Sequence, residues 1–311
     1  MKYRATVSFL IAFFVSLSVA ADDTLFFKRD EYGRLLIPVE TATGESRFFQ
    51  FDTASGRSAM LDVRAELYGV KTYEGGIRHL GSAGLRRVPV GSVRKLSVAG
   101  INRSNHIVAL YPFRGHQDYN DPDIVAGSIG FDGFRGTVVH VTPQTNSMVL
   151  SANSGHLTRS KWGLLAGYPS SNASILVDFV YENIDFTLLI ATGFSRSAIN
   201  YSALKALKPE VKPKALRPKR QLTRGLDANE KDYGTLKLTN LDINGWRLGD
   251  LEVVAAPISS HEFLGFMDEP LLILGADVLT NMELVFDFRD FQLWYPLSTE
   301  GVVSLSEVND R

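Results

Sequence analysis

The stretch IATGFSRSAI, residues 190–199, decides the fold because a near copy of it, FDTASGRSAM, occupies residues 51–60. The two copies are offset by 139 residues, since 191 − 52 = 139. The threonine after the acid position and the Arg-Ser-Ala triplet are the same in both copies. The position with obvious acid chemistry differs, because Asp52 aligns with Ala191. A repeated element therefore carries an acid in one copy and a methyl group in the other.

A second repeat follows downstream of each copy. GFDGFRGTVVHVTPQTNSMVL, residues 130–150, aligns with GADVLTNMELVFDFRDFQLWY, residues 275–295, at an offset of 275 − 130 = 145. The same offset joins KLSVAGI (95–101) to NLDINGW (240–246). The second half therefore holds six more residues (145 − 139), in the region of the Lys- and Pro-rich stretch 205–220. Repeats of this length indicate two halves built on one plan.

The local sequence pattern indicates a mostly β chain. Short runs rich in branched and aromatic residues are separated by Gly, Asn, Asp and Ser turns. These runs are RLLIPVET, RFFQFDT, SILVDFVY, FTLLIAT, LEVVAA and ELVFDF. Hairpin turns are predicted at residues 42–46 and 182–185, and short helices after each decapeptide and after Gly130 and Gly275.

The polar, Gly-containing stretch 151–163 is the predicted boundary between the halves. It divides the chain into a first half, residues 21–155, and a second half, residues 156–311. Each half has the size of an ordinary small domain.

These features together resemble the aspartic proteases. The apolar-Asp-Thr-Gly turn, followed downstream by an apolar-Gly pair and a helix start, is the pattern of that family, and the duplicated form resembles its two-lobed, pepsin-like arrangement of retropepsin-like halves. The resemblance covers nearly all of the chain after residue 20. It implies an all-β fold with short helices, in which two pseudo-symmetric β-barrel lobes flank a central cleft. It also places GGIRHLGSAG (75–84) at the flap, a hairpin over the cleft.

The resemblance implies a catalytic dyad formed by the acids of the two turns. Such carboxylates share one proton and one water, because like charges so close together cannot both ionise. Here Asp52 is the retained member and Ala191 stands at the position of the lost one. The implied supporting residues are Thr53, Ser55, Thr192 and Gly193. Ala54 is a milder departure, since the family has Gly there and Ala keeps the backbone N–H.

The expected function is therefore a non-catalytic or very weak pseudoprotease that binds an extended peptide or protein segment in the cleft. The alternative is an active aspartic endopeptidase with a non-standard site. Asp52 could also serve only as a structural turn acid. Asp178 and Asp185 do not replace the missing acid, because Asp185 lies six residues (191 − 185) before the turn, about 20 Å along a strand.

The first twenty residues have the features of a secretory signal peptide: a basic start, an apolar run over residues 7–15 and small residues before position 20. An uncleaved anchor is the alternative, although the run is shorter than the roughly 20 residues of a membrane span. We expect a periplasmic or secreted protein with no later transmembrane span. The chain has no cysteine, so disulfides and thiol catalysis are excluded.

The charge and the histidine spacing limit the remaining classes of ligand. The formal net charge of −1 argues against a nucleic acid partner. The six histidines show no metal-ligand spacing, so no metal and no cofactor are expected. The basic stretch 205–220 is expected to be a solvated loop, with a docking patch for an anionic surface as its alternative. We expect a monomer.

Overall fold

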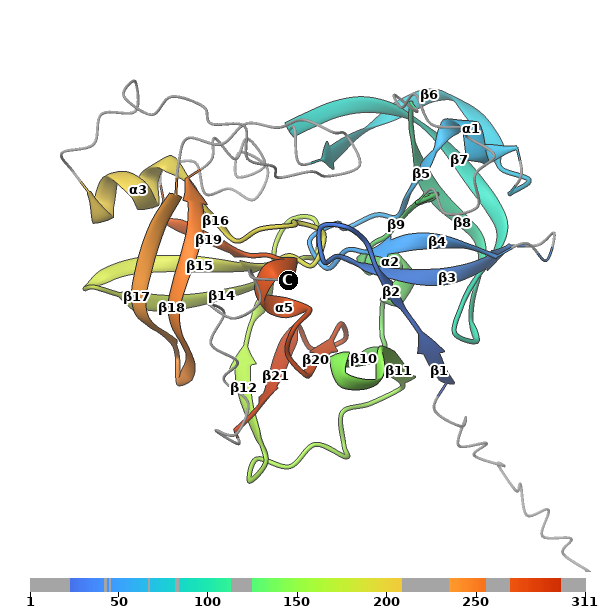
Figure 1. Cartoon of the computed structure of the whole chain (residues 1–311). Helices are drawn as coiled ribbons and strands as arrows, with labels where there is room; N and C mark the ends of the chain where they lie inside the picture. Colours follow the sequence, from blue (N-terminus) through green and yellow to red (C-terminus); the bar gives the residue numbers. More distant parts are fainter. Residues whose placement is uncertain are drawn as a thin grey trace, which may run out of the picture.

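The computed structural model describes residues 23–41, 44, 46–66, 68–81, 84–112, 125–208, 235–255 and 269–297. The proposed signal peptide and most of the stretch 205–220 lie outside the described residues. The described chain is mainly β and forms three sheets. Two of them belong to one half each, and the third draws strands from both halves (Figure 1).

The first half forms an eight-stranded sheet in the order β2-β3-β4-β9-β5-β8-β7-β6. A further pairing of β3 with β7 folds this sheet back on itself. Its apolar side chains fill the interior, where Ile37 and Val39 are fully buried. The strands are β2 (Lys28–Arg29), β3 (Leu35–Thr41), β4 (Ser46–Phe51), β5 (Ala59–Leu61), β6 (Lys71–Gly81), β7 (Gly84–Val98), β8 (Ile101–Tyr111) and β9 (Gly127–Ile129).

The second half forms a seven-stranded sheet in the order β13-β14-β15-β19-β16-β18-β17. Its pairing repeats that of the first half, because β15–β19 and β16–β18 are parallel as β4–β9 and β5–β8 are. The predicted mainly β fold is confirmed. The strands are β13 (Tyr168–Pro169), β14 (Ile175–Tyr181), β15 (Ile184–Ile190), β16 (Ala198–Ile199), β17 (Thr235–Ile243), β18 (Trp246–Ala255) and β19 (Leu271–Leu274).

A six-stranded sheet joins the halves, in the order β1-β11-β10-β20-β21-β12. The junction is the antiparallel pair β10–β20. The Phe51 ring packs edge-on against two other rings, with its centroid 5.0 Å from that of Phe134 and 5.6 Å from that of Phe286. The strands are β1 (Asp23–Phe26), β10 (Val138–Thr142), β11 (Ser147–Ser151), β12 (Trp162–Ala166), β20 (Leu284–Asp287) and β21 (Gln292–Pro296). This sheet contains strands from both sides of the predicted boundary at residues 155/156. The division of the chain into two lobes therefore stays a prediction.

The helices in the described part of the chain are short and lie where the sequence predicts them. They are α1 (Asp62–Ala65), α2 (Phe131–Phe134), α3 (Tyr201–Leu207) and α5 (Ala276–Leu279), and a 3-10 turn, η1, spans Pro143–Thr145. Asn200 caps α3 by accepting a 2.9 Å hydrogen bond from the backbone N–H of Ala203. No helix in the described part of the chain is long and apolar enough to span a bilayer.

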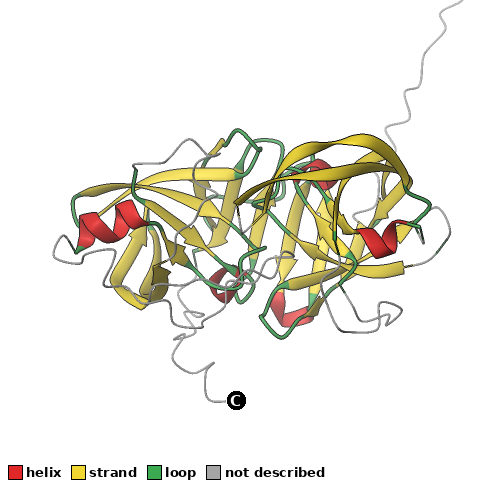
Figure 2. Cartoon of the chain, turned by 90° about the horizontal axis from the view of Figure 1, so that it is seen from above, coloured by secondary structure: helices red, strands yellow, loops and turns green. Residues whose placement is uncertain are grey.

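The β6–β7 hairpin contains the stretch 75–84 that the resemblance assigns to the flap. It arches over the first half, and its end is directed toward the second half (Figures 1 and 2).

Candidate functional site

The two repeated turns meet at the centre of the molecule and bond to each other reciprocally. Thr192 Oγ1 donates to Phe51 O (2.7 Å) and accepts from Thr53 N (3.1 Å). Thr53 Oγ1 donates to Ile190 O (2.8 Å) and accepts from Thr192 N (3.1 Å). Both threonines are buried. The hydroxyl groups of Thr53 and Thr192 therefore fix the two turns in one geometry.

Each turn is also held by an acid from a short helix. Asp132 of α2 accepts hydrogen bonds from N and Oγ of Ser58, both at 2.7 Å. Asp277 of α5 accepts from N and Oγ of Ser197, both at 2.8 Å. Burial raises the pKa of Asp277, while these hydrogen bonds lower it. Because both carboxylates accept hydrogen bonds from backbone and serine donors, neither is available to pair with Asp52.

The Asp52 carboxyl group lies at the contact between the two turns. Its Oδ1 accepts a 3.0 Å hydrogen bond from the backbone N–H of Ala54. A Cβ placed on Gly193 would overlap the Asp52 carboxyl atoms, so the carboxyl group packs directly on the glycine backbone. Burial raises the pKa of Asp52 to about 6, opposed by the backbone N–H groups of Ala54 and Ser55 and by the charge of Arg34.

Ala191 occupies the corresponding place in the second turn and is completely buried. Its environment is apolar: it clusters with Leu176, Leu189, Ala198, Val254, Leu271 and Ile273. Ala54 packs against the same cluster. Ala54 is the counterpart of Gly193 (193 − 139 = 54), the residue on which the Asp52 carboxyl group rests. Because the two turns repeat each other, we expect the Ala54 methyl group to lie where a carboxylate at position 191 would need space.

Polar groups from the second half hold the turn at Ala54. Ser174 Oγ and Asn172 Nδ2 donate to Ala54 O at 2.7 and 3.2 Å. The position matching Ser174 is Arg34 in the first half, at the same place in the hairpin β2–β3 as Ser174 has in β13–β14. Arg34 pairs with Asp30 at 2.6 Å. The two halves therefore have a neutral hydroxyl group and a cation at matched positions, and the charge of Arg34 lowers the pKa of Asp52.

Two further contacts complete the centre. Gln50 Nε2 donates a buried 2.8 Å hydrogen bond to Gly193 O. Ser55 Oγ donates to Arg57 O at 2.7 Å, so this predicted supporting residue stabilises its own turn. The sequence analysis missed Gln50, Arg34, Asn172 and Ser174. The repeat of the hairpin at an offset of 174 − 34 = 140 is the signal that could have indicated the last three.

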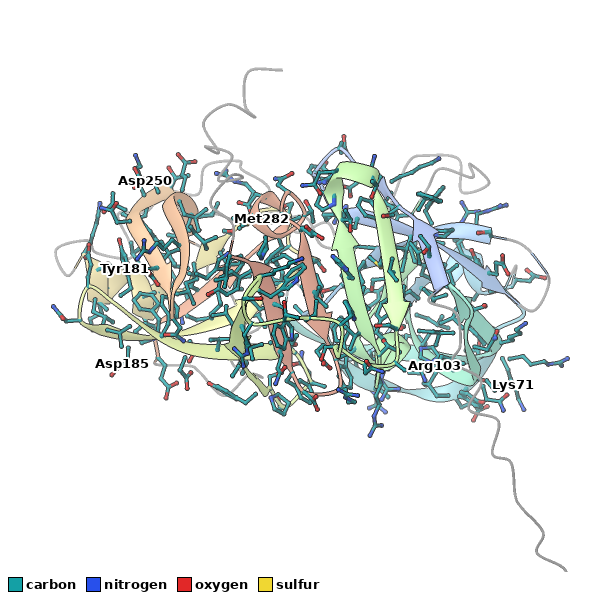
Figure 3. All side chains as sticks on the ribbon, turned by 90° about the horizontal axis from the view of Figure 1, so that it is seen from below. Lys71, Arg103, Tyr181, Asp185, Asp250 and Met282 are labelled. Carbon is teal, nitrogen blue, oxygen red and sulfur yellow. The ribbon has the colours of Figure 1, made fainter. Side chains whose placement is uncertain are left out.

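The two other acids considered from the sequence lie away from this centre. Asp178 accepts hydrogen bonds from Tyr168 Oη (2.6 Å) and Thr187 Oγ1 (3.2 Å). Asp185 is exposed opposite Val180, near the end of β14–β15 (Figure 3). In the part of the chain that the structure describes, no group of three or more His, Asp or Glu side chains could hold a metal ion.

Comparison with known proteins assigns the fold. No protein-family model matches the chain, and no curated protein sequence does. Among solved structures, the chain is similar to the aspartic proteinase from Irpex lacteus, with a TM-score of 0.53 and 12% identity. That similarity covers 92% of this chain and 100% of the other. At this identity the similarity shows a common aspartic-proteinase-like fold.

Proposed function

We propose that this protein is a pseudoprotease, which holds an extended peptide or protein segment between its two halves without cleaving it. The single observation that carries the proposal is the asymmetry of the central turns. Asp52 offers a half-buried carboxyl group, whereas Ala191 opposite it is sealed in an apolar cluster. Peptide cleavage by an acid pair needs one group that takes a proton from water and another that donates one. One carboxyl group cannot do both at once.

Binding needs no second acid. Extended peptides bind to sheet proteins by adding a strand, with backbone hydrogen bonds giving affinity and side-chain pockets giving selectivity. The β6–β7 hairpin, directed toward the second half, offers a strand edge for this purpose (Figure 2). Asp52 is mostly protonated below about pH 6 and mostly ionised above it. It can therefore donate a hydrogen bond to a peptide carbonyl under acidic conditions and accept one from an N–H under neutral conditions.

The test has an activity arm and a binding arm. The purified chain lacking residues 1–20 is incubated with an unfolded protein substrate from pH 3 to 7, beside Asp52→Asn. We expect no cleavage from either. Cleavage that Asp52→Asn abolishes would instead establish the alternative, an active aspartic endopeptidase with a non-standard site.

For binding, amide NMR shifts are followed while a pool of random ten-residue peptides is added. We expect the largest changes at Gly193, Ala54 and the β6–β7 hairpin, with Trp162 in the shared sheet unaffected. Shifts confined to other regions would refute the cleft as the binding site.

We also propose that the protein is exported and acts as a monomer. The support for export is the sequence pattern of residues 1–20. Mass spectrometry of the protein recovered from its native host would give the mature N-terminus, which we expect near residue 21. Light scattering of that protein would give its mass.

A further inference from the structure

A pocket of about 470 Å³ opens in the first half beside the central turn. It is bounded by Gly56 and Arg57 of the turn that carries Asp52, by β8 residues 102–107, and by Asp132 and Arg135 around α2. Three arginines line it: Arg57, Arg103 and Arg135. It lies outside the contact between the two turns described above.

Arg103 is fixed in position by the backbone of the first half. Its Nε donates to Gly133 O (3.1 Å) and its Nη2 donates to Arg135 O (2.8 Å). Burial lowers the pKa of the Arg103 guanidinium; the Asp132 carboxylate opposes this shift and the Arg135 charge adds to it. The Arg103 and Arg135 guanidinium groups thus lie close together, and Arg103 is held by backbone carbonyls. An anion between the two guanidinium groups would reduce their mutual repulsion.

A buried imidazole also lines the pocket. The side chain of His106 is only 8% exposed and lines the same pocket. Its Nε2 atom makes no hydrogen bond, and it lies 3.4 Å from Asp132 Oδ2. The other oxygen of Asp132 is taken by Ser58. Among the described residues that line the pocket, three are arginines and one, Asp132, is an acid.

The second half has a different set of residues at the matched positions. With the offset of 145, Arg103, His106 and Arg135 correspond to Leu248, Leu251 and Thr280. Ile107 corresponds to Glu252, which pairs with Arg196 at 2.8 Å. Arg196 is itself the counterpart of Arg57, since 196 − 139 = 57. The structural plan therefore does not require a basic pocket here.

We propose that this pocket binds an oxyanion group, a phosphate or a carboxylate. Guanidinium groups bind both by charge-assisted, bidentate hydrogen bonds. Asn102, Ser104 and Asn105 on the pocket wall add uncharged donors. The oxyanion has two possible sources: a free inorganic anion, or an acidic side chain of a peptide lying near the central turn. Only the second source rests on the proposed function.

The experiment uses inorganic phosphate as the first probe, with the full mature chain and calorimetry or amide NMR shifts at fixed ionic strength. Arg135→Gln is the main variant because this side chain is exposed and only its backbone supports Arg103. We expect it to weaken phosphate binding about tenfold, the usual effect of losing one charged hydrogen bond. Arg247→Gln is the matched control: Arg247 is the counterpart of Asn102 on the second half (247 − 145 = 102), and its side chain is 88% exposed. This control is expected to bind like the wild type.

A second variant lowers the positive charge of the pocket by adding an acid instead of removing an arginine. Ile107→Glu places next to Arg57 the acid that pairs with Arg196 in the other half, and is expected to weaken phosphate binding at least as much as Arg135→Gln. Thermal melting verifies that each variant is folded. The proposal is overturned if phosphate binding is unchanged in both pocket variants, or falls equally in Arg247→Gln.

A pair of peptides, hexaglutamate and hexaglutamine, distinguishes the sources. Hexaglutamate binding that depends on Arg135, with no binding of hexaglutamine, identifies the oxyanion as a peptide side chain. Phosphate binding without hexaglutamate binding supports the pocket and assigns it to a free anion, whatever becomes of the proposed peptide function. If neither phosphate nor hexaglutamate binds, the pocket proposal is wrong.

Discussion

The two central turns share their backbone frame but differ in chemistry. In the first, Asp52 rests on Gly193 and has Arg34 nearby. In the second, Ala191 is packed among aliphatic side chains. The residue that packs against this cluster from the opposite turn is Ala54, whereas the residue that Asp52 contacts in the opposite turn is Gly193. The threonine bonds between the turns are nevertheless equal in pattern and nearly equal in length. The threonine bonds that join the two turns are therefore present although the residues at positions 52 and 191 differ in chemistry.

The largest expected effect comes from rebuilding the acid pair. Ala191→Asp alone should remain inactive, because the Ala54 methyl group obstructs the new carboxylate. Ala54→Gly combined with Ala191→Asp should give acid-favoured cleavage of an unfolded substrate, with a rate about two to four powers of ten above background. Adding Asp52→Asn to this double variant should abolish the cleavage. Equal activity of the single and double variants would show that Ala54 does not restrict the site.

The next effect tests whether the frame is truly symmetric. Thr192→Val leaves the buried Phe51 O and Thr53 N–H without their partner, and we expect it to lower the free energy of unfolding by about 2–4 kcal/mol. Thr53→Val should cost about the same. Denaturant unfolding measures both, with Thr239→Val, at an exposed position of β17, as a control of small effect. A clear difference between Thr53→Val and Thr192→Val would mean that one half dominates the junction.

The third effect separates the turns by their response to pH. The folded state holds the Asp52 proton up to about pH 6, whereas the unfolded chain releases it near 3.8. This group's contribution to the free energy of unfolding therefore falls as pH rises from about 4 to 6, by at most about 3 kcal/mol. Asp52→Asn removes that loss, so its stability advantage over the wild type should grow through this window and level off above it. If the stability difference between Asp52→Asn and the wild type does not change with pH, Asp52 does not titrate in this range.

The smallest effect concerns the residues beside the two turns. Arg34→Gln removes a charge that lowers the pKa of Asp52, so that pKa should rise above about 6. Ser174→Ala, at the matched position, should leave it unchanged while weakening the contact with Ala54. Carbon NMR of the Asp52 carboxyl group during a pH titration measures both. An unchanged pKa in Arg34→Gln would remove Arg34 from the site.

The sequence was sufficient to predict the structure of the two turns, because only a few residue types can occupy each of their key positions. The turn threonines must supply hydroxyl groups that donate and accept at once. Gly130 and Gly275 must be glycine, because a Cβ there would overlap the backbone at Arg57 and Arg196. The contacts of Gln50 and Ser174 could not be predicted in this way, because such side chains satisfy buried carbonyls in many folds. The basic pocket was missed because its arginines come from separate elements that meet only in the folded chain.

The shared six-stranded sheet has a consequence for the order of folding. β10 ends at Thr142, but its partner β20 begins only at Leu284, 142 residues later (284 − 142). Pairings so distant in sequence are slow to form, and until β20 arrives one edge of β10 presents open backbone groups to other chains. We therefore expect refolding to end in a slow step that closes this sheet. Chains that terminate before residue 284 should aggregate through β10, so β20 completes the shared sheet and also protects the first half.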